Sequence, residues 1–357
     1  MIPEEYKPKI LDKTKGEKLL SERPRPVLID AFGHQLEELF FIDNPKFIGE
    51  DKIKVYKSND FANYSKKKSQ DFIFVYYPWN YHLVKCVQKD DYFALKTNRN
   101  KDLITLYEQE RLSGFSVAVL GLSVGSNIAF ALTQSGISQQ ITIADYDELD
   151  TTNLNRIIAG VHQIGLNKTI VTARRIYEDN PFANVQIFPK GINKENLEKL
   201  LEGGSVDCII DEVDDVLLKI DVRRLAMKYK VPVVMVTDNG DGIVLSIERY
   251  ELGCQTILHR EVSRWAKITE EFEKGKSKEL SGKIIIEDIV GGAEHVDLKM
   301  MASVKRVLNK ELISWSQLED TEAGLRCFIA IHRKNSAMPS FVRLCSFCIG
   351  SVKTLNP

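Results

Sequence analysis

Five residues in the middle of the chain are of the types that could bind a nucleotide together: Gly121, Asp145, Arg156, Lys168 and Asp214. Glycine lets a backbone turn approach a phosphate closely, and a carboxylate accepts hydrogen bonds from ribose hydroxyls. A guanidinium and an ammonium neutralise phosphate oxygens, and a second carboxylate can hold Mg²⁺. A dinucleotide site would explain the glycine and one acid, but not the other three residues. The set therefore favours ATP.

The sequence Gly-Leu-Ser-Val-Gly-Ser at 121–126 predicts a turn from a strand into a helix. Gly121 and Gly125 would bring the backbone close to a phosphate at a helix N-terminus, where free N–H groups favour anions. Ser123 lies between them and is a further cofactor-binding candidate. The spacing lacks the full G-x-G-x-x-G pattern, so a tight turn needed only for packing also accounts for the glycines.

Two acidic residues follow the next predicted strand. Asp145 ends that strand 24 residues after Gly121, where a carboxylate commonly binds ribose. This role fits NAD and ATP equally. Asp147 could assist with the ribose or a metal, or be an ordinary loop carboxylate.

Further polar residues follow along the chain. Asn153 and Arg156 lie just past the strand, and Lys168 opens the next helix. A converging Arg and Lys can spread over three phosphates and stabilise departing pyrophosphate, although an Arg and a Lys on a surface loop are the alternative. Asp214 follows a later strand, at the sheet edge where α/β proteins bind ligands, and is placed to hold Mg²⁺. Its acidic neighbours at 212 and 215 could instead cap the next helix.

Apolar, β-branched segments alternate with helical patterns from residue 117 to residue 236. This alternation predicts an α/β fold with a Rossmann-like, mostly parallel sheet and helices on both faces. Residues 242–252 alternate apolar and polar side chains, as an edge or antiparallel strand would. The predicted strands are 117–120, 141–144, 185–188, 208–210 and 231–236, and the predicted helices are 126–135, 168–177, 196–201 and 219–229.

The chain divides into three predicted regions: 1–95, a small α/β region; 96–255, the nucleotide-binding core; and 256–357, which is mainly helical with a mobile loop. In the first region, Leu36, Leu39 and Phe40 have helical spacing that ends at Pro45, and residues 71–87 predict a strand, a turn at Pro78 and a strand. Lys66, Lys67 and Lys68 predict a solvated polar loop. In the last region, 270–283 is the charged loop, and 300–312 and 315–318 predict helices.

Composition narrows the class of protein. The 357 residues carry 49 Lys and Arg against 50 Asp and Glu, so the net charge of −1 creates no field that attracts nucleic acid or a membrane. The N-terminal residues lack the apolar stretch of a signal peptide, and the longest apolar stretch, 115–132, is too interrupted for a membrane span. Six cysteines spread over this length do not predict a disulfide framework, so we expect a reducing compartment, the cytoplasm.

The core from about residue 99 to residue 250 resembles the ThiF/MoeB superfamily of adenylate-forming enzymes, which are related to ubiquitin-activating enzymes. The matching segments are the glycine turn, ADYDELDTTNLNR at 144–156, the G-x-x-K of Gly165 and Lys168, and the D-x-x-D of Asp211 and Asp214. The resemblance implies that Asp145 holds the ribose, Arg156 and Lys168 the phosphates and Asp214 Mg²⁺, while Asn153 lines the phosphate end. It also implies that Arg99, in TNRNKDLIT, reaches the active site of a partner protomer in a homodimer.

Residues 74–87, the short glycine turn and residues 299–318 resemble a subgroup of bacterial ThiF-type proteins often fused to a nitroreductase-like domain. No segment here is long enough for that flavin domain, so flavin is not expected. Three features depart from the superfamily. The glycine loop is one residue short, Ile157 replaces a glutamine, and only one C-x-x-C is present, at Cys345 and Cys348. Cys254 and Cys327 could complete a zinc site, and Cys254 could be a reactive thiol or a bystander.

We therefore expect an ATP- and Mg²⁺-dependent adenylyltransferase. Its substrate would be a carboxylate, on a small molecule or at a peptide or ubiquitin-like C-terminus. Three alternatives stay open. They are a non-catalytic, nucleotide-binding dimerisation partner, an NAD(P)-dependent oxidoreductase that uses only Gly121, Gly125 and Asp145, and a nucleoside-modifying dehydratase. The absence of a basic surface argues mildly against a tRNA substrate.

Overall fold

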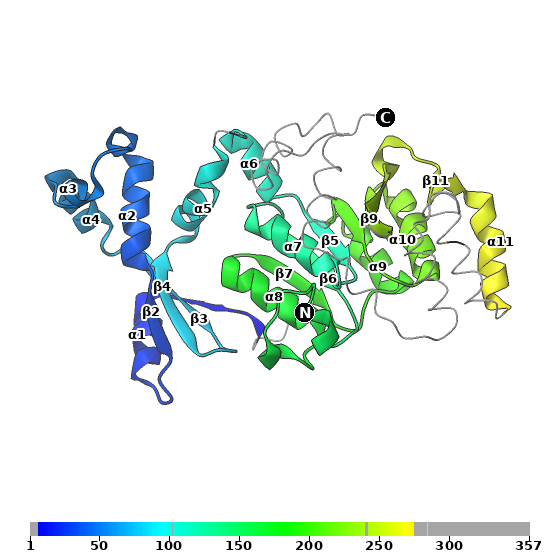
Figure 1. The fold of residues 1–357 in the computed structure, drawn as a ribbon, viewed down its shortest axis with the longest axis horizontal. Helices are drawn as coiled ribbons and strands as arrows, with labels where there is room; N and C mark the ends of the chain where they lie inside the picture. Colours follow the sequence, from blue (N-terminus) through cyan, green and yellow to red (C-terminus); the bar gives the residue numbers. More distant parts are fainter. Residues whose placement is uncertain (1–5, 102, 240–241, 275–283, 285–357) are drawn as a thin grey trace.

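A computed structural model describes residues 6–101, 103–239, 242–274 and 284. A four-stranded sheet with helices occupies one end of the molecule, a six-stranded sheet lies in the middle, and α11 (Val262–Glu273) lies at the other end (Figure 1). The predicted helices at 300–312 and 315–318 lie outside the described residues.

The six-stranded sheet has the order β10-β9-β8-β5-β6-β7. Five strands are parallel, and β10 pairs antiparallel with β9 at one edge, so the predicted Rossmann-like sheet is confirmed. The strands are β5 (Val117–Leu120), β6 (Gln140–Ala144), β7 (Asn184–Phe188), β8 (Cys208–Asp211), β9 (Val233–Asn239) and β10 (Gly242–Glu248).

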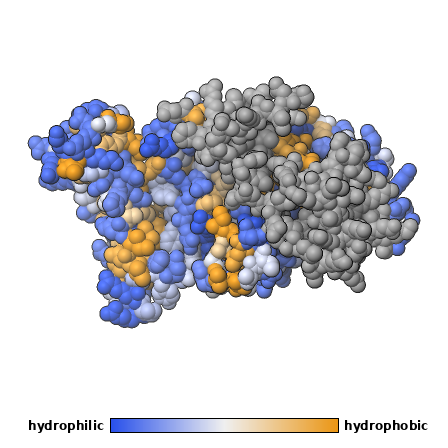
Figure 2. Space-filling view, viewed as in Figure 1, coloured by the Kyte–Doolittle hydropathy of each residue, from blue (hydrophilic) through white to orange (hydrophobic). Residues whose placement is uncertain are grey.

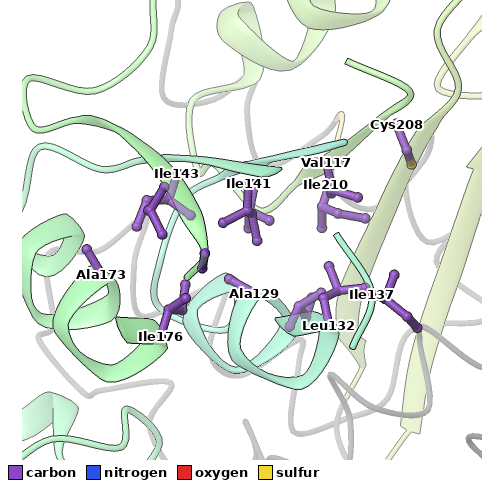
Figure 3. Close-up of a cluster of buried hydrophobic side chains, with 14 of the residues drawn as sticks. Val117, Ala129, Leu132, Ile137, Ile141, Ile143, Ala173, Ile176, Cys208 and Ile210 are labelled. Carbon is purple, nitrogen blue, oxygen red and sulfur yellow. The ribbon is translucent and has the colours of Figure 1, made fainter. Parts of the chain in front are cut away.

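Helices cover both faces of this sheet because successive side chains of a strand point to opposite faces. Val117 and Val119 pack with α7 (Gly125–Gln134) and α8 (Lys168–Asp179) on one face, as Figure 3 shows for Val117. Ala118 and Leu120 pack with α9 (Lys194–Glu202) and α10 (Val216–Tyr229) on the other. Each buried aliphatic side chain contributes about 1.5–3 kcal/mol relative to exposure. The sheet is therefore a rigid support for the loops at its carboxyl edge.

The N-terminal sheet has the order β1-β3-β4-β2. The predicted strand–turn–strand is confirmed as β3 (Phe72–Tyr77) and β4 (His82–Val87), and the helix before Pro45 is α2 (Phe32–Asp43). The other elements are β1 (Lys9–Leu11), α1 (Lys13–Ser21), β2 (Val27–Asp30), η2 (Pro45–Phe47), α3 (Lys52–Tyr56) and α4 (Asn59–Lys68).

Two sequence predictions are wrong. Lys66, Lys67 and Lys68 form the last turn of α4 rather than a loop, because Ser58 caps that helix and lysines are favourable at a helix C-terminus. The charged loop does not begin at residue 270, because α11 continues to Glu273. Short elements also follow the core, namely η6 (Tyr250–Leu252), β11 (Thr256–Ile257) and β12 (Arg260–Glu261).

The connector between the two sheets consists of α5 (Lys89–Thr97), η3 (Asn98–Asn100) and α6 (Leu106–Ser113). The predicted boundary at residue 95 falls inside α5. Side chains of the N-terminal region bind the C-terminal end of α8: Tyr77 Oη donates to the carbonyl of Tyr177 at 3.2 Å, and Trp79 Nε1 donates to Glu178 at 2.8 Å. The last turn of α8 therefore anchors the N-terminal sheet to the core.

Among the described helices, none combines the length and the apolar character that crossing a bilayer requires.

Candidate active site

Gly121 is required by the close approach of two strand ends. It has a φ of +89°, and a Cβ added to it would lie 2.3 Å from the carbonyl oxygen of Glu212, just past β8. Gly125 packs as tightly, since its Cβ would lie 2.8 Å from Val119 Cγ1. Both glycines therefore serve packing, and they also bring the turn against the loop that carries Asp214.

The N-terminus of α7 can receive an anion. Its N-cap, Val124, makes no side-chain capping bond. The N–H of Asn127 donates to the carbonyl of Val124 at 3.0 Å. The N–H groups before it in the first turn have no partner within the helix, and they carry the positive end of its dipole. The turn thus offers backbone donors at the point where the sequence predicts phosphate.

Asp145 fixes the turn from the neighbouring strand. Its carboxylate accepts the backbone N–H groups of Leu122 at 2.7 Å and Asp147 at 2.8 Å. Burial raises the pKa of the Asp145 carboxyl, and the N–H of Asp147 and the charge on Lys168 oppose that rise. A carboxylate has about four lone-pair positions, so two remain after these two bonds. Asp145 can therefore hold the turn and still accept from a ligand hydroxyl.

Arg156 reaches the glycine turn across the loop that contains η4 (Thr151–Asn153). Its Nε donates to Ser123 Oγ at 2.8 Å, and Nη1 donates to the carbonyl of Thr152 and to Asn155. The backbone is held as well, because Asn127 Nδ2 donates to the carbonyl of Arg156 at 2.7 Å. The structure therefore brings the predicted guanidinium and the predicted turn together.

Asn153 and Ile157 shape this loop from inside. Asn153 is buried, and its Oδ1 accepts the N–H of Asp150 at 2.9 Å, which caps η4. Ile157 is buried with Leu149 and Val171 in a small apolar cluster. Ile157 stands where the superfamily has a glutamine. It therefore anchors the loop from inside and does not line the open edge of the loop.

Lys168 opens α8, as predicted, and is buried. Its Nζ lies 2.8 Å from a carboxylate oxygen of Asp147, and its backbone N–H donates to the carbonyl of Asp147. The half-exposed Asp147 therefore holds the ammonium beside Asp145. A phosphate could compete for that ammonium.

Asp214 lies in the exposed loop between β8 and α10. The preceding backbone at residues 212 and 213 abuts Gly121. The charge of Asp147 raises the pKa of the exposed Tyr146 most, and burial and the charge of Asp214 raise it further. Asp214 therefore lies close to Tyr146, on the same sheet edge as the ribose candidates. Asp215 caps α10 by accepting from Leu218 N, which confirms the alternative reading for that neighbour.

A buried ionic network beneath this loop was not predicted. Asp211, at the end of β8, pairs with Arg223 and with Lys219 Nζ at 3.3 Å, and Arg223 Nε donates to Glu248 at 2.6 Å. Glu248 also accepts from Tyr250 Oη at 2.9 Å. Burial favours the neutral acid, but Lys219 and Arg223 outweigh it and hold the pKa of Asp211 below its usual value. The network therefore fixes the strand end from which Asp214 extends.

Arg99 is not part of this cluster within one chain. It is exposed in η3, and the adjacent Thr97 and Asn100 contact Gly136 and Ser135, just beyond the C-terminus of α7. The glycine turn lies at the opposite end of α7, about 15 Å away for a ten-residue helix. If Arg99 acts at a glycine turn, that turn must therefore belong to a second copy of the chain.

The described part of the chain contains no cluster of metal-ligating side chains, and it contains three free cysteines. No group of three His, Cys, Asp or Glu side chains there could enclose a metal ion. Burial raises the pKa of the Cys86 and Cys208 thiols to about 12, which keeps them protonated. Cys254 lies 3.3 Å from Thr256 Oγ1. Cys327, Cys345 and Cys348 lie outside the described residues.

Comparison with known proteins identifies this core. Residues 95–262 match the ThiF family. The uncharacterised protein MT1398 of Mycobacterium tuberculosis is 37% identical over 177 residues, which are 50% of this chain and 24% of that protein. A probable molybdopterin-synthase adenylyltransferase of Porphyra purpurea is 38% identical over 114 residues, or 31% of this chain and 29% of that protein.

The Escherichia coli tRNA threonylcarbamoyladenosine dehydratase is 32% identical over 142 residues, which are 38% of this chain and 52% of that protein. A solved structure of the E. coli enzyme of this name, TcdA, in complex with ATP has a TM-score of 0.41 and 28% identity. It covers 44% of this chain and 65% of that one. The chain thus spans between about a quarter and about half of the length of these curated relatives.

Residues 95–262 form a ThiF-family domain, and this domain belongs to the ThiF/MoeB superfamily.

Proposed function

We propose that the protein adenylates a carboxylate at the expense of ATP, with release of pyrophosphate. The observation that carries the proposal is the hydrogen bond from Arg156 to Ser123, which brings a guanidinium to an uncapped helix N-terminus. Such a site suits a polyphosphate, because the backbone N–H groups and the guanidinium both donate to phosphate oxygens. The Porphyra relative is named as an adenylyltransferase, which agrees with this chemistry.

In the proposed reaction, a substrate carboxylate oxygen attacks the α-phosphorus of ATP. A bond forms between these two atoms, and the bond from the α-phosphorus to the bridging oxygen breaks, so that its electrons leave with pyrophosphate. The carboxylate is already ionised at neutral pH, so no general base is needed. Catalysis then depends on positioning and on neutralising the departing charge by Arg156 and Lys168.

Asp145 is the proposed ribose acceptor, and the turn residues Gly121, Ser123 and Gly125 would surround the phosphates. Asn153 would support this end by holding the loop that carries Arg156. Lys168 would exchange its bond with Asp147 for a phosphate oxygen, which leaves Asp147 free to accept from the ribose.

Asp214 would hold Mg²⁺ together with phosphate oxygens. One exposed carboxylate fits this ion, because Mg²⁺ keeps several waters and is commonly bound by one or two carboxylates plus substrate phosphates. When bound, the ion would neutralise charge on the phosphates.

Arg99 would act on a second copy in a homodimer. It lies at the far end of α7 from its own glycine turn and is exposed, so a neighbouring subunit could receive it. We also propose a reducing compartment, the cytoplasm, because six cysteines spread over 357 residues do not indicate a disulfide framework.

A dehydratase acting on a modified nucleoside is the second candidate, and the similarity to the E. coli tRNA threonylcarbamoyladenosine dehydratase favours it. Both candidates use the same nucleotide site, so the acceptor distinguishes them. The net charge of −1 favours a peptide or small carboxylate over tRNA.

The test has two stages. Thermal unfolding with Mg²⁺ and ATP should give a higher midpoint than unfolding with NADH, because only a ligand that binds the folded state stabilises it. Exchange of labelled pyrophosphate into ATP is then measured over a panel of carboxylates and C-terminal peptides. Exchange with one substrate would support adenylation. Stabilisation by NADH alone would contradict it, and ATP binding without exchange across the panel would favour a non-catalytic role.

A further inference from the structure

A cavity of about 410 Å³ lies where the N-terminal sheet meets the C-terminal end of α8. Small-molecule sites in proteins typically have volumes of about 300–1,000 Å³, so the cavity is large enough for a ligand. Lys168 opens α8 and Glu178 lies near its other end, about 15 Å away at 1.5 Å per residue. The cavity is therefore separate from the candidate active site.

Much of the cavity wall is apolar. Val75 on β3 and Val84 on β4 are register partners, and Tyr77 shares their face because alternate residues of a strand point the same way. Pro181 and Tyr92 also line the cavity. The hydroxyl groups of both tyrosines are occupied, since each donates to a backbone carbonyl at the end of α8. The wall therefore offers mainly hydrocarbon surface to a ligand.

The end of α8 at the cavity is electronegative. Its last two residues, Glu178 and Asp179, are acidic, and its last turn contains no basic residue. The free carbonyl groups at a helix C-terminus carry the negative end of the helix dipole, so acids are unfavourable there and cations are favourable. Lys96 pairs with Asp179 and compensates its charge. Glu178 has no such compensation.

Glu178 is the only Asp, Glu, Lys or Arg among the described residues that line the cavity. Its carboxylate accepts the neutral indole N–H of Trp79 at 2.8 Å, and no ion pair joins it to a cation in the described part of the chain. Arg174, one turn earlier on α8, is not a lining residue, and its guanidinium lies over the rings of Tyr6 and Trp79. Burial raises the pKa of Tyr77 most, and the charge of Glu178 raises it further, so this charge acts on the cavity wall.

Two amide side chains add hydrogen-bond donors to the lining. Gln35 Oε1 accepts the N–H of Val87 at 3.0 Å, and Asn80 Oδ1 accepts the N–H of His82 at 3.1 Å. Both amides keep an NH₂ group that can donate to a ligand or to water. The cavity thus combines an apolar wall, one uncompensated carboxylate and two amide donors.

We propose that this cavity binds a small organic ammonium ion with an apolar body. The ammonium group pairs with Glu178 at the negative end of α8, and the apolar body covers Val75 and Val84. A cation bound here would relieve the unfavourable placement of an acid at a helix C-terminus. The proposal does not depend on adenylation.

The test titrates 2-phenylethylammonium into the full-length protein and follows binding by calorimetry, with 2-phenylethanol as the neutral counterpart. Saturable binding of the amine is expected. The alcohol should bind about fivefold more weakly, because it cannot form the ion pair. In Glu178→Gln the amine should lose about the same factor, so that the two probes bind alike.

The matched control for this variant is Glu202→Gln. Glu202 is the last residue of α9 and is exposed, and it accepts a neutral O–H from Tyr229 at 3.2 Å, as Glu178 accepts a neutral N–H. It lies outside the cavity. Binding of the amine should be unchanged in this control.

A second pair of variants tests the location of the site. Figure 2 shows exposed hydrophobic residues on the N-terminal region, so the apolar body of a probe could bind elsewhere on that surface. Val84→Trp fills the cavity and should abolish binding of both probes. Ile53→Trp, on α3, is the control, because Ile53 is 65% exposed and lies outside the cavity. Thermal unfolding shows whether each variant is folded.

Four results would overturn the proposal. They are the absence of saturable amine binding, equal binding of the amine and the alcohol to the native protein, equal losses in Glu178→Gln and Glu202→Gln, and unchanged binding in a folded Val84→Trp protein. Tighter binding of Nα-acetyl-lysine-N-methylamide than of the free amine would also overturn it, because the cavity would then belong to a lysine side chain of a protein.

ATP-induced thermal stabilisation is measured in every variant. It should be unchanged, because the cavity lies at the far end of α8 from Lys168. A failure of amine binding with intact ATP stabilisation would therefore concern the cavity alone and not the nucleotide site.

Discussion

Arg156 Nε donates to Ser123 Oγ at 2.8 Å, although the two residues are 33 positions apart in the chain. This bond orients a guanidinium toward the N-terminus of α7. We predict that Ser123→Ala weakens ATP binding about fivefold, because loss of one hydrogen bond costs about 1 kcal/mol. Calorimetric titration with Mg²⁺ and ATP measures the affinity of the variant and of the native protein for ATP. Ser113→Ala, on α6, is the control, and unchanged affinity in Ser123→Ala would mean that the hydroxyl does not position Arg156.

Gly121→Ala should destabilise the fold by more than about 2 kcal/mol, because a left-handed φ and a clash act together. The added Cβ would lie 2.3 Å from the carbonyl oxygen of Glu212. Gly165→Ala separates the two causes: its φ is +84°, but no atom lies within 4 Å of the added Cβ, so strain alone of about 1 kcal/mol is expected. Urea midpoints at pH 7 measure the loss of stability in both variants. Equal losses in the two variants would show that the backbone near Gly121 moves to avoid the clash with Glu212.

Asp211→Asn tests the buried network through pH. The lowered pKa of Asp211 in the folded state means that its carboxylate stabilises the fold above its unfolded pKa, near 3.8, and that this stability is lost as the pH falls through the lower folded value. The variant should unfold about 3–5 kcal/mol more easily at neutral pH, since it removes the buried carboxylate of Lys219 and one of the two buried carboxylates that pair with Arg223. The difference in urea midpoint between the two proteins should shrink below about pH 3.8. A difference that stays constant from pH 7 to pH 3 would contradict the assigned charge.

Arg99 gives a test of the subunit arrangement. If Arg99 acts across a dimer, Arg99→Ala and Asp214→Ala proteins should each lack pyrophosphate exchange, once a substrate is known. A mixture of the two should recover part of the activity, because one of the two sites in a mixed dimer would then hold both native residues. No recovery in a mixture shown to exchange subunits would contradict the action of Arg99 across a dimer.

Much of the core could be predicted because its strands are buried on both faces. Such strands are continuous apolar segments, and β5 has the predicted bounds. The polar residues at the carboxyl ends of these strands could be placed for the same reason, since parallel strands bring their ends to one edge. This is why Arg156 and Ser123 were assigned to one site from the sequence alone.

What could not be predicted depends on pairing between distant segments. Arg223 and Glu248 are 25 positions apart, and charged residues are normally exposed, so nothing in either sequence segment indicates a buried pair. The strand β2 was also missed, because four exposed residues directly before a helix show no alternation. Lys168 was correctly placed on α8, but its partner Asp147 follows only from the folded loop.

The most direct test compares ATP with AMP. Binding of each nucleotide is measured by calorimetry for the native protein and for Arg156→Met, which keeps the length of the side chain but removes its charge. A charge-assisted hydrogen bond to the β- or γ-phosphate contributes about 1.5–3 kcal/mol, so ATP affinity should fall about tenfold to a hundredfold while AMP affinity changes little. Equal affinity of the variant and the native protein for ATP, or an equal loss for both nucleotides, would contradict a triphosphate site at Arg156.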